Sequence, residues 1–177
     1  MKKLVIGLML GSAMLFAAVP AQALVSVSAD VPLQYTYKES GEAADSVSGV
    51  KIGIKLPILV GLGLETYTAE SEDAGVKFSH SIQMLDVFYE LPIPVINIAL
   101  GLGLGQASAE TNFGSYTYDN GFASQYWLSV GYAFAAVIDL HLGYHVVNGK
   151  VVGTDGATES KVDISGNMIS LGVRIGL

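Results

Sequence analysis

The chain alternates apolar and polar residues with a period of two along eight separate segments. In the first, residues 25–38, Val25 and Val27 alternate with Ser26 and Ser28. The same alternation recurs at 50–56, 59–69, 78–91, 96–105, 125–134, 138–146 and 169–177. A period of two places successive side chains on opposite faces of an extended strand. The sequence therefore predicts eight antiparallel β-strands, each with one apolar and one polar face.

The first segment of the chain has a different pattern. Lys2 and Lys3 precede an apolar run at 4–19, and the small residues of Pro20-Ala21-Gln22-Ala23 follow. This is the pattern of a secretory signal peptide, which predicts removal of residues 1–23 and a barrel domain over 24–177. An uncleaved anchor helix is the alternative, but the run is shorter than the ~20 residues that a spanning helix needs.

Composition narrows the class of protein. Hydrophobic residues make up 51% and charged residues only 14%, which excludes a disordered chain. Nine Lys and Arg against sixteen Asp and Glu give no basic surface for nucleic acid. The absence of Cys excludes disulfides, thiolate metal sites and thiol catalysis. Beyond the first segment, the apolar uncharged stretches 91–106 and 126–138 are too short for spanning helices, which leaves a closed barrel as the way across a membrane.

The connections between the predicted strands alternate in length. Short ones lie near Pro57, Pro92 and Ala135, and longer polar ones lie at 39–46, 70–77, 111–121 and 148–160. Short periplasmic turns and long external loops are typical of barrels in the bacterial outer membrane. We therefore predict an all-β fold, an eight-stranded antiparallel up-and-down transmembrane β-barrel in that membrane. Pro32 lies inside the first strand and lacks a ladder donor, so a β-bulge is expected there.

Aromatic residues cluster toward both ends of the predicted strands, as in the two aromatic girdles of outer-membrane barrels. The predicted girdle toward the long loops comprises Tyr35, Tyr37, Phe78, Phe122, Tyr126 and Tyr144, and that toward the short turns comprises Tyr89, Tyr132 and Phe134.

The polar face of the strands carries charges of both signs, and it is predicted to line the barrel interior. The expected lumen network comprises Lys51, Lys55, Glu65, Asp86, Glu90, Asp139, His141, His145 and Arg174. An eight-stranded barrel is only wide enough to be filled by side chains or to hold one small ligand, so these charges must largely pair. His141 and His145 are about 13 Å apart along a strand, which is too far to chelate one metal. No metal site and no cofactor are expected, and inward glycines such as Gly61 and Gly101 would leave room for larger side chains.

The C-terminal segment, residues 172–177, resembles the assembly signal of bacterial outer-membrane proteins. Gly172 is followed by hydrophobic residues at alternate positions, including Ile175 and the final Leu177, where that family usually has Phe or Trp. The resemblance implies insertion by the barrel-assembly machinery. The whole mature chain resembles the small eight-stranded barrels typified by the OmpA transmembrane domain, OmpX and OmpW. The repeated phrase Leu-Pro-Ile then Gly-Leu-Gly-Leu, at 56–64 and 91–104, is similar to uncharacterised glycine-rich outer-membrane proteins.

Three functions remain open at this point. A packed, charged interior favours a structural, envelope-stabilising role or a loop-mediated, adhesion-like interaction, in a monomer whose partners are outer-membrane lipid and lipopolysaccharide. A narrow channel for small solutes or ions is the alternative. A lipid-modifying enzyme is the third, because Phe78-Ser79-His80-Ser81 resembles the Phe-x-His-x-Ser pattern of lipid A deacylases. Serines adjacent to His80 point to the opposite face of a strand, so no enzyme activity is predicted.

Overall fold

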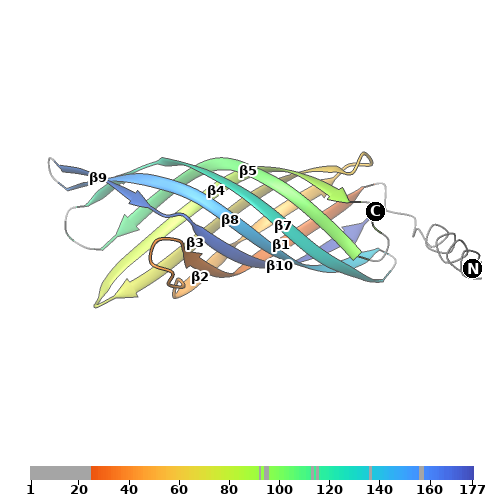
Figure 1. Ribbon diagram of the computed structural model, residues 1–177, viewed down its shortest axis with the longest axis horizontal. Helices are drawn as coiled ribbons and strands as arrows, with labels where there is room; N and C mark the ends of the chain where they lie inside the picture. The colour runs from red at the N-terminus through yellow and green to blue at the C-terminus, as the bar shows by residue number, and fades with distance from the viewer. Residues whose placement is uncertain are drawn as a thin grey trace, which may run out of the picture.

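The structure, a computed structural model, describes residues 25–91, 93, 96–112, 114, 116–135, 137–155 and 158–177, and these form a closed antiparallel barrel (Figure 1). Eight strands make its wall: β1 (Ser26–Tyr37), β2 (Ser46–Lys55), β3 (Val60–Asp73), β4 (Val76–Leu91), β5 (Ile96–Thr111), β7 (Gly121–Ala135), β8 (Ile138–Asp155) and β10 (Gly166–Gly176). β10 pairs with both β8 and β1, which closes the ring and confirms the predicted fold class. The expected signal peptide, residues 1–23, lies outside the described residues. In the part of the chain that is described, no helix has the length and hydropathy to cross a membrane.

The outer face of the barrel carries a belt of exposed aliphatic side chains. On β5, Leu100, Leu102 and Leu104 are 50%, 67% and 60% exposed, while the intervening Gly101 and Gly103 are buried. The predicted alternation is therefore realised with the apolar face outward. A water-facing surface of this kind would be strongly unfavourable, because each exposed Å² of apolar area costs roughly 25 cal/mol. The belt is the lipid-facing surface of a transmembrane barrel.

The two ends of the barrel differ. The short turns and the described C-terminus lie at one end, and the hairpins β3–β4 and β8–β9 reach far out at the other (Figure 1). Because short turns face the periplasm in such barrels, we call the first the periplasmic end and the second the extracellular end. β6 (Thr117–Asp119) and β9 (Thr158–Asp163) both pair with β8 at the extracellular end, outside the barrel ring.

The expected bulge in β1 is present. The register against β10 shifts between Pro32 and Gln34, so Leu33 is the extra residue. One extra residue reverses the parity of every side chain beyond it, and Tyr35 consequently points into the barrel, with no exposed surface. The ladder between β1 and β2 runs only from Ser26 to Asp30, below the bulge.

Two of the four predicted long loops are wrong, because the strands continue through them. β3 and β4 stay paired up to Asp73 and Val76, where 70–77 was expected to be a loop. β8 runs to Asp155 and pairs with β9, where 148–160 was expected to be a loop. Beyond the lipid belt neither face of a strand needs to be apolar, so the alternation that marks the strands ends before the strands do. A short part of the 111–121 connection also forms a strand, β6.

The tight turn that joins β3 and β4 yields a first prediction. Its two central residues have left-handed backbone angles, with φ of 49° at Ala74 and 84° at Gly75. Two-residue hairpin turns of this kind favour Asn or Gly, because a Cβ makes the left-handed region unfavourable by about 1–2 kcal/mol. We expect Ala74→Asn to raise the free energy of unfolding by up to about 1 kcal/mol in urea titrations of the reconstituted barrel. Gly75→Ala serves as the opposite control and should lower it. Equal effects of the two substitutions would contradict the turn.

Candidate functional site

The periplasmic half of the interior is filled by an ion-pair cluster. Arg174 on β10 lies with its Nη1 2.8 Å from Glu90 Oε2 and 3.5 Å from Asp139 Oδ2. Lys55 on β2 pairs with the other oxygen of Glu90 at 3.3 Å. Asn97 donates to Asp139 from β5. Strands far apart in the sequence are thus tied together across the interior.

His141 lies between two carboxylates in the same half. Its Nε2 is 2.7 Å from Asp30 Oδ1, and its Nδ1 is 3.1 Å from Asp139 Oδ1. Both nitrogens of the His141 ring are thus within hydrogen-bond distance of a carboxylate oxygen, which fixes the ring between β1 and its own strand β8. All three residues are almost fully buried. Asp30, which has the same inward parity on β1 as Ser26 and Ser28, is therefore part of this cluster.

A second cluster surrounds Lys51 at mid-barrel. The Lys51 Nζ lies 3.4 Å from Asp86 Oδ2, 3.7 Å from Glu65 Oε2 and 3.4 Å from the centre of the Trp127 ring. Gln125 donates to both carboxylates, at 2.5 Å to Glu65 and 2.9 Å to Asp86. His145 lies beside this cluster. Its ring stacks on Trp127 and lies within hydrogen-bond distance of Gln125 and Ser170.

The structure thus places all nine predicted lumen residues inside the barrel, divided between two clusters. His141 belongs to the periplasmic cluster and His145 to the mid-barrel one. Sequence reasoning missed Gln125, Asn97 and Ser170, which are neutral and so give no charge signal. The alternation of each strand places these three residues on the inward face, and this is the signal that could have identified them. No group of His, Asp and Glu suited to holding a metal ion occurs in the described residues.

Aromatic rings occupy the space over the inward glycines. Gly61 pairs with Phe88 across the ladder, and Gly101 pairs with Trp127. A Cβ added at Gly61 would overlap the Phe88 ring, and one added at Gly101 would overlap the Trp127 indole. The glycines leave room as expected, and that room is already filled by a neighbouring ring instead of a ligand.

An apolar plug fills the interior above the mid-barrel cluster. It comprises Tyr35, Tyr67, Ala69, Ile82, Met84, Ala107, Ala109, Ala123, Val147, Val151, Ile164 and Met168. The Tyr35 hydroxyl donates to the carbonyl of Ile164 at 2.5 Å, which fixes the ring across the barrel. The sequence did not predict this plug, because it lies where the strands were expected to end. Among the described residues, the plug and the two clusters follow one another along the barrel interior.

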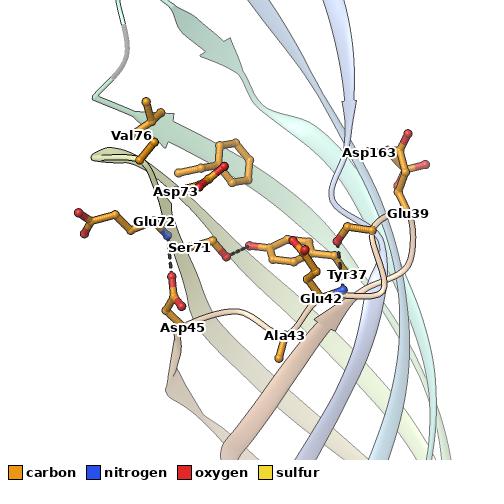
Figure 2. Close-up of a pocket in the computed structure, with 13 residues that line it drawn as sticks. Tyr37, Glu39, Glu42, Ala43, Asp45, Ser71, Glu72, Asp73, Val76 and Asp163 are labelled. Carbon is orange, nitrogen blue, oxygen red and sulfur yellow. Dashed lines mark hydrogen bonds between the residues drawn. The ribbon is translucent and has the colours of Figure 1, made fainter.

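A cleft of about 770 Å³ opens at the extracellular end, beside the loop that joins β1 and β2 (Figure 2). Tyr37, Val76 and Phe78 form its apolar part, and all of its charged lining residues are acidic: Glu39, Glu42, Asp45, Glu72, Asp73 and Asp163.

Hydrogen bonds hold the two walls of the cleft together. Asp45 accepts from the backbone N–H of Glu72 at 2.6 Å, and the Ser71 hydroxyl donates to Tyr37 at 3.5 Å. Hydrogen bonds from Ser165 hold the pKa of Asp163 below its usual range, so this carboxylate stays ionised at neutral pH.

The predicted aromatic girdle needs correction at the extracellular side. Phe122, Tyr126 and Tyr144 face outward there, and Tyr89 and Tyr132 face outward near the periplasmic end. Tyr35 and Tyr37 do not, because the bulge reverses their parity. Phe78 has inward parity on β4 and packs against the plug, with Tyr118 beside it. The side chain of Phe134 lies outside the described residues.

The deacylase-like motif and the C-terminal motif both have structural explanations. His80 has no exposed surface, and its Nδ1 lies 3.3 Å from the Tyr37 hydroxyl.

Gly172 lies against His141 and Asp30, where a Cβ would overlap both side chains. Ile175 faces outward in the belt, and Leu177 is exposed at the periplasmic end. The glycine of the C-terminal motif is therefore required by packing in the periplasmic cluster.

Comparisons with known proteins support the fold. No family model and no curated protein matches the chain. Among solved structures, the chain is similar to the Neisserial surface protein A, with 17% identity, a TM-score of 0.66 and coverage of 89% of this chain and 99% of that one. OprG from Pseudomonas aeruginosa follows with 10% identity, a TM-score of 0.55 and coverage of 88% and 97%. The outer membrane protein W of E. coli has 8% identity, a TM-score of 0.55 and coverage of 88% and 98%.

These likenesses concern the fold, which they share over nearly the whole length of each solved chain. The lipid-facing belt is a property of this chain itself. The two observations together show that the chain has the fold of the small eight-stranded β-barrels of the bacterial outer membrane, with a lipid-facing belt of its own.

Proposed function

We propose that this barrel is a sealed structural member of the outer membrane that acts through its extracellular end. The observation that carries the proposal is the filled interior: two ion-pair clusters and an apolar plug follow one another along the barrel axis. A conducting pore needs a continuous polar path, and the plug interrupts it with aliphatic and aromatic side chains. The channel alternative has no comparable observation in its favour.

The extended strands at the extracellular end are the surface available for interaction. The β3–β4 and β8–β9 hairpins hold the acidic cleft beyond the lipid belt on continuous ladders. A paired strand is a more rigid support than an open loop, and hydrogen bonds from Glu72 and Ser71 tie the β1–β2 loop side of the cleft to β3. Its uniformly acidic lining suits a partner that presents basic groups.

The route to the membrane completes the proposal. We infer that residues 1–23 direct export and are removed, that the C-terminal segment engages the barrel-assembly machinery, and that the folded protein is a monomer. Lipid and lipopolysaccharide surround the belt.

Single-channel recording in planar bilayers tests the sealed interior. We expect no stable unitary openings from this barrel. Heat-modifiable mobility on gels shows that the sample is folded, and a porin added to the same bilayer is the conducting control. Stable openings whose ion selectivity changes when Lys51 or Arg174 is replaced would overturn the proposal in favour of a channel.

A further inference from the structure

Strand β9 has one edge that no other strand covers. Among the described residues β9 pairs only with β8, and it stands beyond the lipid belt at the extracellular end (Figure 1). In an antiparallel ladder the backbone groups of every second residue point away from the paired strand. The N–H of Ile164, directly after β9, donates to the Gly149 carbonyl of β8. By this alternation the backbone groups of Glu159, Lys161 and Asp163 point away from β8.

The other strand edges beside the cleft are covered by the chain itself. The β1–β2 loop folds back on β1, where the Tyr37 N–H donates to the Glu42 carbonyl. On β3, the N–H of Glu72 donates to the Asp45 carboxylate. The part of the chain that the structure describes gives β9 no such cover, so its outward N–H and C=O groups can pair with another chain.

A chain added to this edge would lie directly above the end of β1. The Lys38 N–H, just after β1, donates to the Ser165 carbonyl, just after β9. Beyond this hydrogen bond the chain turns away into the β1–β2 loop, while β9 continues outward paired only with β8. Asp163 lies here in the cleft lining, across from Glu72 and Asp73 of β3 (Figure 2). The unpaired edge therefore borders the acidic cleft.

The charge of the cleft decides which partner fits this edge. The charged lining residues are all acidic, so they attract an extended segment that carries Lys or Arg. A second copy of the chain would bring the same carboxylates and would be repelled. Tyr37, Val76 and Phe78 offer apolar surface to the aliphatic stems of the basic side chains.

We propose that β9 and the acidic cleft bind an extended basic peptide segment of a partner protein, which adds to the barrel as a strand. Its backbone forms hydrogen bonds with Glu159, Lys161 and Asp163, while its Lys and Arg side chains pair with the cleft carboxylates. The backbone contacts supply affinity and the side chains supply specificity. This mode of binding rests on the proposed role of the extracellular end and specifies the partner of that end.

Fluorescence anisotropy of a labelled peptide tests the site. The probe is a short peptide of alternating Lys and Val, and the barrel is held in phosphatidylcholine nanodiscs, because a zwitterionic lipid does not attract the peptide. The same peptide N-methylated throughout keeps every charge but has no backbone donors. We expect it to bind at least tenfold more weakly, and a peptide with Glu in place of Lys should not bind.

A pair of substitutions at Lys161 separates strand addition from charge. Lys161→Pro removes the outward N–H but leaves the ladder with β8 in place, because that N–H points away from β8. It also removes a positive charge, which by itself would favour a basic peptide. We expect about tenfold weaker binding for Lys161→Pro, whereas Lys161→Thr loses the same charge, keeps the N–H and should bind at least as well as the unmodified barrel.

A second pair of variants tests the carboxylates. Glu39→Gln/Glu42→Gln removes two charges from the cleft lining and should weaken binding about tenfold. Glu110→Gln/Asp119→Asn is the matched control, because it removes two exposed charges on β5 and β6 outside the cleft lining. This control should bind the peptide normally. Heat-modifiable mobility shows that each variant is folded.

Equal affinity of Lys161→Pro and Lys161→Thr, or of the N-methylated and unmodified peptides, would overturn strand addition. Absence of any binding by the basic peptide would overturn it as well. A barrel that is a dimer without peptide, and a monomer after Lys161→Pro, would identify the edge as a contact between copies and have the same consequence. Failure of the sealed interior is a separate result, because stable single-channel openings would leave peptide binding unchanged.

Discussion

Gly61→Ala is expected to destabilise the barrel by about 1–3 kcal/mol, although it adds only one methyl group to a strand. The new Cβ would overlap the Phe88 ring, which is buried in the interior against Trp127 and cannot move outward through the wall. Urea unfolding in lipid vesicles, followed by heat-modifiable mobility, measures the effect.

Gly63→Ala is the matched control, two residues along the same strand and on the same inward face. A Cβ there would lie 3.3 Å from the Ile52 carbonyl oxygen and 3.4 Å from the Asp86 Cβ, a tight fit that a shift of a few tenths of an ångström relieves. We expect a change within about 1 kcal/mol, since removing a glycine also lowers the entropy of the unfolded chain.

A second substitution separates the ring overlap from other causes. Phe88→Ala by itself should lower the free energy of unfolding. In the Gly61→Ala background the same substitution should lower it much less, because it also removes the overlap with the new Cβ. Strictly additive effects would show that the ring is not the obstacle.

Lys51→Met is expected to cost about 3–5 kcal/mol, because it leaves Glu65 and Asp86 buried without their cation. Both carboxylates are within 4 Å of the Lys51 Nζ, and Asp86 has no exposed surface. The methionine side chain has nearly the same length, so packing against Trp127 is largely kept and the loss reports on charge. The free energy of unfolding in urea is again the measurement.

Lys77→Met is its control on the same protein. Lys77 forms an ion pair with Glu72 at 3.6 Å, but its side chain is 70% exposed at the extracellular end. Exposed ion pairs contribute about 0–1 kcal/mol, so Lys77→Met should leave the free energy of unfolding almost unchanged. Adding Asp86→Asn to Lys51→Met should recover part of the loss. Equal costs for Lys51→Met and Lys77→Met would refute a tightly coupled interior.

The lipid-embedded part of the barrel could be predicted from the sequence because lipid imposes a strict rule on it. Every second residue from Ile98 to Leu104 must be apolar, so the pattern shows that this segment is a strand and which of its side chains face the lipid. The interior charges could be assigned for the same reason, since Lys51 and Glu65 fall on the other parity. Which charges pair could not be predicted, because that depends on the stagger between strands.

The extracellular part could not be predicted in this way. Beyond the belt water meets both faces of β3 and β4, so polar residues at 70–77 no longer distinguish a strand from a loop. The bulge was expected at Pro32, but its effect on parity was not carried through to Tyr35 and Tyr37. The wrong placement of Tyr35 and Tyr37 in the outer girdle follows from this one residue, whereas the rest of the plug was missed because it lies where the strands were expected to end.

The extra residue at Leu33 has a consequence for how such barrels diverge. In most strands a one-residue insertion would move every following side chain between lipid and interior at once and would be eliminated by selection. At a bulge the insertion is absorbed within one strand, and only the residues beyond it, near the water, exchange faces. A single added residue can therefore turn a lipid-facing tyrosine into interior filling, while β10 stays paired with β1 on both sides of the bulge.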